Sequence, residues 1–550
     1  MSSWKTISRA SLLAALLGGS ALAQQPIEVE RLDALDPLEV GLSGAGLGNG
    51  LWAGTDRDLA VAALGALPSA GDGRYGSEAV SDLARAVLAT GGQPPAGGRG
   101  DSDLAALRID RLVAASSASD AFDLLERTPG INRAPQLARW HAELGFATGN
   151  PDRACRTADA LIEGRDTAYW LRARAFCLAL QDRSAAAELT AELARSQGED
   201  DGFDARLFAI TLGMPLAADA PGSDSGLEWA MEHYLAAASA DDAAAHGTGL
   251  AADAPLWLRR AAHDAMERHD RPVTDPVAAL VAAQSMDGME RHHALEAVLA
   301  QGQDREMSGR ALGLLLADTG GGARFVHVAR HHGREIDSLP ITAATLEHGY
   351  EIALAAVLVG DLRAADAWRD ALIDGPPRAR PVSAPADVAP GLPGGMPAPE
   401  IVPEPEWVPP SPRRMVALDL AIAIASDRMG GGGFEAVLAA WAEAGGDAVL
   451  PDLLALNRLG APAAPGLRAG LLAHTPDAGT APVPGLAAMD AAVRARARAE
   501  AALDAIAVLD RPETSGDPDA LSRAIGALDA TGLRRQALAV MLERVVQGAL

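Results

Sequence analysis

Lysine, cysteine and aromatic residues are scarce in this chain of 550 residues. Lys5 is the only lysine, which excludes a Walker-type phosphate loop and Schiff-base chemistry in the rest of the chain. Aromatic residues make up 4% of the sequence, and alternating runs rich in Val, Ile, Tyr and Phe are nearly absent. No segment reaches the roughly 18 uninterrupted apolar residues that a transmembrane helix needs. The chain therefore lacks the signals of a β-sheet protein and those of a membrane-spanning one.

The N-terminal residues have the pattern of an export signal. Lys5 and Arg9 are basic, residues 10–21 form a short apolar run, and Ala21-Leu22-Ala23 is the small-x-small sequence that signal peptidase recognises. Residues 1–23 are therefore predicted to be a signal peptide. Gln24 follows the cleavage site in place of the cysteine of a lipoprotein. We expect a periplasmic or secreted protein that does not insert into the membrane after the signal is removed.

The predicted mature chain is strongly acidic. Without Lys5 and Arg9, 45 basic residues face 73 acidic ones, a formal charge of 45 − 73 = −28. Such a surface repels nucleic acids and anionic lipids, because both carry the same sign of charge. We therefore expect neither nucleic acid nor an anionic membrane surface as a partner.

The sequence favours an all-α fold. Ala, Leu, Arg and Glu dominate segments of about 11–17 residues that Gly, Pro, Asp or Ser separate, as in "SDLAALRIDRLVAAS". Helices this short bury their apolar faces only by packing on neighbouring helices. This is typical of helical repeat proteins.

Four segments share one spacing of residues. A turn residue is followed five positions later by an alanine, and a bulky apolar residue lies about ten positions before the turn. The turn residues are Gly149, Gln181, Gly360 and Gly532, the alanines are Ala154, Ala186, Ala365 and Ala537, and the bulky residues are Trp140, Trp170, Tyr350 and Leu521. Glycine suits a left-handed helix cap, and alanine allows the next helix to cross closely.

This spacing resembles the tetratricopeptide repeat (TPR), a pair of helices in a 34-residue unit. The resemblance is clearest over residues 134–198 and extends to 341–374 and 521–549, although Gly149 and Gln181 are 32 residues apart. It implies a TPR-like α-α superhelix, a solenoid of short antiparallel helix hairpins.

A Pro-rich segment interrupts the helical pattern. Residues 376–413 are too rich in proline to form a helix and favour extended backbone. A linker or surface insertion is the default interpretation, and a docking strip with Trp407 as its anchor is the alternative. The predicted organisation is as follows: signal peptide 1–23, Gly-rich segment 24–54, helical repeats 55–375, Pro-rich segment 376–413 and helical repeats 414–550.

The two cysteines are predicted to form a disulfide. Cys155 and Cys177 lie on consecutive helices on either side of a turn at Gly164-Arg165, at similar distances from it. An exported protein meets an oxidising compartment, where such a pair closes. Two buried free thiols and an active redox or metal-binding pair are the alternatives. CxxC spacing and two further zinc ligands, which the last alternative would need, are missing.

Histidines provide the one candidate metal site. His327, His331 and Glu335 fall at i, i+4 and i+8, so on a continuous helix they share one face. Gly333 interrupts that window, and a polar helix face is the preferred interpretation, so no metal is assigned. His292 and His293 carry less weight, since adjacent helical side chains point about 100° apart.

No cofactor and no catalytic residue are predicted. The glycine runs at 44–50 and 430–433 have no strand before them, which a dinucleotide-binding loop requires. The superhelical domains of soluble lytic transglycosylases offer a comparison, but residues 414–550 show no acid in an aromatic-lined cleft of the kind that glycan cleavage needs.

The segment "LDPLEVGLSGAGLGNGLWAGTD", residues 35–56, together with the acidic, Ala-rich composition, resembles a group of uncharacterised exported helical proteins from alphaproteobacteria. The resemblance implies an exported protein and transfers no active site. The leading hypothesis is a non-enzymatic periplasmic scaffold whose concave surface binds another envelope protein. A peptidoglycan-acting enzyme and a purely architectural envelope spacer with two rigid arms are the alternatives.

Overall fold

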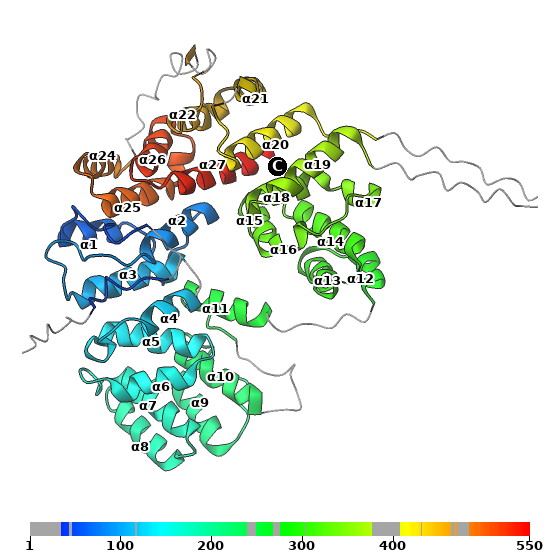
Figure 1. Ribbon diagram of the computed structural model, residues 1–550. Helices are drawn as coiled ribbons and strands as arrows, with labels where there is room; N and C mark the ends of the chain where they lie inside the picture. The colour runs from blue at the N-terminus through cyan, green and yellow to red at the C-terminus, as the bar shows by residue number, and fades with distance from the viewer. Residues whose placement is uncertain are drawn as a thin grey trace, which may run out of the picture. The chain divides into compact units, whose positions relative to one another are not determined.

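The computed structural model confirms an all-α fold (Figure 1). It describes residues 35–42, 47–115, 118–238, 249–267, 275–302, 304–376, 407–430, 432–463, 468–469 and 483–550. Within these residues there are helices, turns and two isolated β-bridges, but no strand. The predicted signal peptide 1–23 and most of the Pro-rich segment lie outside the described residues.

The first half of the chain folds into short helices. They are α1 (Arg57–Gly65), α2 (Glu78–Leu88), α3 (Ser102–Ala115), α4 (Ala118–Glu126), η1 (Ile131–Arg133), α5 (Pro135–Ala147), α6 (Pro151–Ala160), α7 (Ala168–Leu180), α8 (Ser184–Arg195), α9 (Asp201–Leu212), α10 (Gly226–Ala238) and α11 (Leu256–Glu267).

The second half continues in the same way. Its helices are α12 (Pro276–Ala283), α13 (Gly288–Gln301), α14 (Arg305–Asp318), α15 (Gly322–His331), α16 (Gly333–Ile336), α17 (Ala343–Leu346), α18 (Gly349–Val359), α19 (Leu362–Asp374), α20 (Pro412–Ala425), α21 (Gly432–Gly445), η2 (Gly446–Val449), α22 (Leu450–Arg458), α24 (Leu486–Ala495), α25 (Arg498–Leu509), η3 (Pro512–Ser515), α26 (Pro518–Ala530) and α27 (Arg534–Ala549).

One type of turn joins many of these helices. At Gly149 the backbone is left-handed, with φ of 77°, and the next N–H, of Asn150, donates to the carbonyl of Gly145 at 2.7 Å. This is the Schellman arrangement, which satisfies carbonyls at the end of a helix. The same turn follows α18 and α26, with φ of 82° at Gly360 and 84° at Gly532. The predicted glycines therefore form turns, and the alanine five residues after each is fully buried.

The predicted position of the second turn is wrong by one residue. The left-handed residue after α7 is Asp182, with φ of 58°, and not Gln181. Correspondingly Ala187 is buried five residues later, whereas Ala186 is only half-buried. The spacing from Gly149 is thus 182 − 149 = 33 residues. Aspartate tolerates the left-handed region better than most residues, which explains how it replaces glycine here.

Arg108 secures the segment that precedes α1. This side chain from α3 is buried, and its guanidinium donates to the carbonyls of Leu88 at 2.6 Å, Val40 at 3.0 Å and Thr90 at 3.1 Å. Burial lowers the pKa of Arg108 to about 10, so the group remains charged at neutral pH. Residues 38–40 are in this way fixed to the end of α2.

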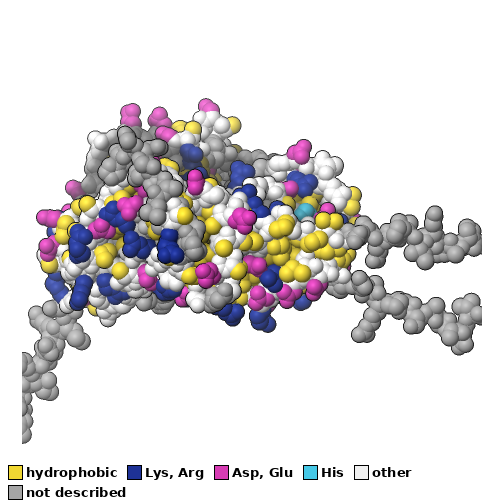
Figure 2. Space-filling model, turned by 90° about the horizontal axis from the view of Figure 1, so that it is seen from above, with side chains coloured by type: hydrophobic (Ala, Val, Ile, Leu, Met, Phe, Trp, Pro, Cys, Tyr) yellow, Lys and Arg dark blue, Asp and Glu magenta, His cyan; other side chains and the backbone are white. Residues whose placement is uncertain are grey.

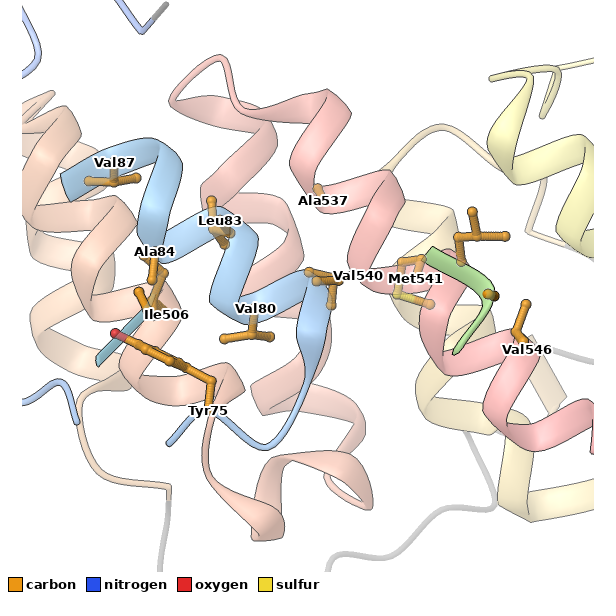
Figure 3. Close-up of a cluster of buried hydrophobic side chains, with 14 of the residues drawn as sticks. Tyr75, Val80, Leu83, Ala84, Val87, Ile506, Ala537, Val540, Met541 and Val546 are labelled. Atoms are coloured by element: carbon orange, nitrogen blue, oxygen red, sulfur yellow. The ribbon is translucent and has the colours of Figure 1, made fainter. Parts of the chain in front are cut away.

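Helices from the two ends of the described chain share a core. Helix α2 packs against α25 and α27, and Figure 3 shows side chains of α2 gathered with Ile506 of α25 and with Val540 and Met541 of α27. Val80 and Leu83 of α2 are fully buried in this cluster. The fold therefore depends on contacts between residues more than 400 positions apart, which a simple linear stack of repeats does not make.

A carboxylate completes this junction. Glu543 of α27 is buried, and its two oxygens accept hydrogen bonds from the N–H groups of Glu78 and Ala79 at 3.1 and 2.6 Å. These N–H groups lie in the first turn of α2 and have no acceptor within their own helix. The negative charge also lies at the positive end of the helix dipole. Glu543 thus caps a helix 465 residues away in the sequence.

We expect Glu543→Gln to destabilise the protein by about 1–3 kcal/mol, because one N–H of α2 loses its acceptor in a buried site. Urea unfolding followed by circular dichroism measures the change. Gln547→Ala, which removes a donor to the same carboxylate but leaves both N–H groups satisfied, serves as the control. Equal unfolding midpoints for Glu543→Gln and the wild type would contradict this role for the carboxylate.

The helices on the two sides of the Pro-rich segment also pack against each other. Helix α20 contacts α18 and α19, and α18 contacts α27. Residues from both sides belong to one hydrophobic core cluster. These contacts argue that the two helical regions fold together and not as separate arms.

Cleavage within residues 380–400 is therefore expected to leave the two fragments associated, because they share buried surface. A specific protease site placed there, followed by size-exclusion chromatography of the cut protein, tests this. The fragments should elute together in buffer and separate only in denaturant. Elution as two folded, independent fragments in buffer would instead support the two-arm organisation.

Candidate functional site

The helix hairpins with the clearest repeat pattern form a module with its own core. Helices α5 to α10 pack in the order α5 with α6, α6 with α7, α7 with α8 and α9, and α10 with α9 and α5. Their buried apolar side chains, among them Phe146, Trp170 and Phe176, form a hydrophobic cluster separate from that of the rest of the protein. We call these helices the α5–α10 module.

A disulfide joins two helices of this module, which confirms the prediction for the cysteines. Cys155 on α6 and Cys177 on α7 are bonded, with their Cα atoms 5.6 Å apart. Both side chains are buried in the core of the module. The bond links the second helix of one hairpin to the first helix of the next, and its role is structural.

Helix α10 covers one face of the module. It packs against both α5 and α9, whereas a simple repeat would place it beside α9 alone. At its first residue the N–H of Gly226 donates to the carboxylate of Glu143 on α5 at 2.7 Å. A side chain at Gly226 would collide with the backbone carbonyl of Glu143, so glycine is required for this close approach.

A buried ionic network holds α10 to α9. Arg206 of α9 is fully buried and forms an ion pair with Glu232 of α10, while Glu228 lies 3.7 Å away. The guanidinium also donates to the Ser223 hydroxyl at 3.0 Å and to the Pro221 carbonyl at 2.7 Å. Two carboxylates therefore face one guanidinium in a site without solvent.

The network contains one carboxylate, that of Glu228, more than the single guanidinium of Arg206 can neutralise. The pKa of Glu228 shows how the site accommodates this excess of negative charge. Burial raises the pKa of Glu228 to about 7; the neighbouring Arg206 opposes the rise, and Asp224 and Asp200 add to it. Burial also raises the pKa of Glu143, whose carboxylate lies beside the Tyr169 hydroxyl. At the acid side of neutrality Glu228 is protonated, and the charges of Arg206 and Glu232 balance.

This network predicts a pH dependence of the contact between α9 and α10. Because the pKa of Glu228 is higher in the folded protein than the usual 4.5, its contribution to stability is complete below about pH 4.5 and is lost as the pH rises through 7. Glu228→Gln mimics the protonated form. It should match the wild type at pH 5 and stabilise α10 by about 1–3 kcal/mol at pH 8.

Hydrogen exchange of α9 and α10 peptides, corrected for intrinsic rates at each pH, measures this difference. Glu232→Gln is the matched comparison: it removes the direct partner of Arg206 and should speed exchange at both pH values. The same effect of Glu228→Gln at pH 5 and pH 8 would contradict the assignment.

Helix α8 exposes its large apolar residues and buries its small ones. Ala187, Ala191 and Ala194 face the core, whereas Leu189 and Leu193 are 73% and 53% exposed. A helix that served only the core would place leucine inside, since burying it removes far more apolar surface from water. The two leucines are four residues apart and therefore form one stripe on the outer side of α8.

Helix α9 adds further exposed apolar side chains. Phe208 and Leu212 are also four residues apart and are more than half exposed, and Met214 follows them. The ion pair between Arg195 and Asp204 places the end of α8 beside the start of α9. We call Leu189, Leu193, Phe208 and Leu212 the α8–α9 apolar surface.

Acidic residues border this surface. Glu188 and Glu192 alternate with the two leucines on α8 and are exposed. Elsewhere the protein mixes charges: Figure 2 shows one face on which Arg, acidic and apolar side chains are intermingled. The border of the α8–α9 apolar surface therefore favours a partner with basic groups.

Trp407 lies within the fold, at the end of the Pro-rich segment. Its indole packs against Gly375, and its N–H donates to the carbonyl of Leu372 at 3.1 Å. The side chain is half-buried against the main core. Trp407 therefore anchors this segment to the end of α19, and its predicted part in docking a partner stays a prediction.

The weak metal-ligand candidates of the sequence, His327, His331 and Glu335, do not all lie on one helix. His327 and His331 stack with their ring centroids 6.3 Å apart, but α15 ends at His331 and Glu335 belongs to the separate helix α16. His331 instead lies near His332 and Glu296 of α13. Sequence reasoning missed Glu296 because α13 and α15 are about 30 residues apart and nothing local links them.

Comparisons with protein-family models, curated proteins and solved structures gave no match for this chain. Among the described helices, none is both long and apolar enough to cross a membrane.

Proposed function

We propose that this protein is a non-enzymatic, protein-binding scaffold of the cell envelope, built on a TPR-like helical solenoid. Its docking site is the α8–α9 apolar surface. The export signal in residues 1–23 supports the location, and the recurring helix hairpins with left-handed turns support the TPR-like description.

The observation that carries this proposal is the distribution of apolar side chains on helix α8. Its alanines face inward and its leucines outward, at positions where a solvated helix would place polar residues. Single exposed apolar residues are common on protein surfaces. Here two consecutive helices, α8 and α9, each expose a pair of large apolar side chains four residues apart, and apolar positions of this kind are what an amphipathic helix of a partner covers when it docks.

The partner that fits is an amphipathic helix of another protein, with an apolar stripe and basic flanks. The apolar stripe would cover Leu189, Leu193 and Phe208, and the basic flanks would meet Glu188 and Glu192. Charge complementarity of this kind increases association rates and selects among partners. An acidic border also disfavours nucleic acid, because the phosphates carry the same sign of charge.

Helix α10 limits where a partner can bind. It occupies the face of α5 and α9 that a linear array of hairpins would leave open, and buried ion pairs hold it there. A partner therefore docks on α8 and the outer side of α9 and need not displace α10. The docking site proposed here is therefore different from the concave surface that the repeat pattern alone suggested.

Two designed peptides test the proposal. One is an 18-residue helix with a leucine stripe flanked by arginines, and the other has glutamates in place of those arginines. Fluorescence anisotropy should show binding of the arginine peptide at least tenfold tighter than that of the glutamate peptide, with the preference shrinking in high salt. Equal binding of both peptides would contradict the role of the acidic border.

Paired substitutions locate the site. Leu189→Glu with Leu193→Glu should weaken binding of the arginine peptide at least tenfold and leave helicity unchanged, since neither side chain is in the core. Val277→Glu with Val281→Glu is the matched control, because these α12 residues are similarly spaced and 55% and 61% exposed. If only the α12 pair weakens binding, the docking site is on α12 and the proposal is wrong.

A further inference from the structure

Two helices distant in sequence bring histidines and a glutamate together. His292 and Glu296 are one turn apart on α13, and His331 and His332 lie at the end of α15. The Nε2 atom of His332 is 3.0 Å from the Oε1 atom of Glu296, and that of His292 is 3.7 Å from the same oxygen. The nearest ligand atoms of Glu296, His331 and His332 lie within 4.8 Å of one another.

The end of α15 explains how two adjacent histidines reach one place. On a continuous helix their side chains would point about 100° apart. Here the helix ends at His331, and His332 has φ of −95° and ψ of 20°, outside the helical range. The two rings meet edge to face with centroids 4.8 Å apart. A break in the helix, and not helical spacing, therefore creates this cluster.

The side chains of this cluster differ in their exposure to solvent. His332 is 4% exposed, Glu296 is partly buried, and His331 and His292 reach solvent. Beside His331 is a surface hollow lined also by Arg330, Gly333, Arg334, Glu335, Val359 and Asp361. Of the four clustered side chains, His331 is the one that lines this hollow.

We propose that Glu296, His331 and His332 bind one divalent transition-metal ion, with Zn²⁺ as the ion that fits best. His292 is the fourth ligand. Imidazole nitrogen and carboxylate oxygen are ligands that Zn²⁺ takes readily, in a tetrahedral set of four. Ni²⁺ and Cu²⁺ accept the same ligands, whereas Ca²⁺ and Mg²⁺ prefer oxygen alone.

The distances require only a small adjustment. Tetrahedral bonds of about 2.0–2.1 Å hold ligand atoms roughly 3.4 Å apart. Glu296 and His332 already meet this spacing. The Nε2 atom of His292 is 3.7 Å from the Oε1 atom of Glu296, and the ligand atom of His331 is within 4.8 Å of those of Glu296 and His332, so metal binding requires both imidazoles to move closer. The His–x₃–Glu pair on α13 supplies two ligands from one rigid helix face.

Calorimetric titration of the full chain, produced without a histidine tag and freed of metal with a chelator, tests this proposal. ZnCl₂ should bind with a stoichiometry of one ion per chain, and MgCl₂ should not compete. Bound Co²⁺ should give the visible absorption of a tetrahedral ion. Absence of stoichiometric Zn²⁺ binding would overturn the proposal.

Single substitutions identify the ligands. His331→Ala, at an exposed position, and Glu296→Gln, which keeps the side-chain shape, should each weaken Zn²⁺ binding at least tenfold. His327→Ala is the matched control on the same helix and should change affinity less than twofold. Circular dichroism checks that each variant folds, and a Zn²⁺-dependent rise in Tm should appear in the wild type and in His327→Ala only.

A different result would assign the site elsewhere. If His327→Ala weakens binding as strongly as His331→Ala while Glu296→Gln has no effect, the ion is held by one face of α15 and the four-residue site is wrong.

Discussion

The left-handed turn between consecutive helices is the constraint on which this structure depends. Each such turn reverses the chain within a few residues, and after Gly149, Gly360 and Gly532 the residue five positions on is a fully buried alanine, which lets the next helix approach closely. Short helices that contain so much alanine have little apolar surface of their own. They become stable by packing on neighbouring helices, within the α5–α10 module through mostly local contacts and in the main core also through contacts between the two ends of the described chain.

The two surfaces with proposed functions arise where the repeat pattern is modified. In the α5–α10 module, α10 lies across α5 and α9 and is held by the buried ion pair of Arg206, which leaves α8 and the outer side of α9 for the proposed docking. At α15 the helix ends at His331, and the Nε2 atom of His332 lies 3.0 Å from the carboxylate of Glu296.

Features encoded by neighbouring residues could be predicted from the sequence, and features encoded across the chain could not. The helices, the turns at Gly149, Gly360 and Gly532, and the disulfide of Cys155 and Cys177 all depend on short-range spacing. The turn at Asp182 was misplaced by one residue, and that at Arg496 was missed, because neither carries glycine. Nothing local signals that α2 meets α27, or that α13 meets the end of α15.

The cap that Glu543 provides for α2 has a consequence for the order of folding. Ribosomes synthesise proteins from the N-terminus, so α2 exists long before the helix that satisfies its first N–H groups. Until α27 emerges, α2 can pack on α3, but it lacks the part of its buried surface that α27 covers, and the N–H groups of Glu78 and Ala79 lack their acceptor. The α5–α10 module, whose contacts are mostly local, can fold during this interval. The junction between α2 and α27 cannot form until α27 has been synthesised.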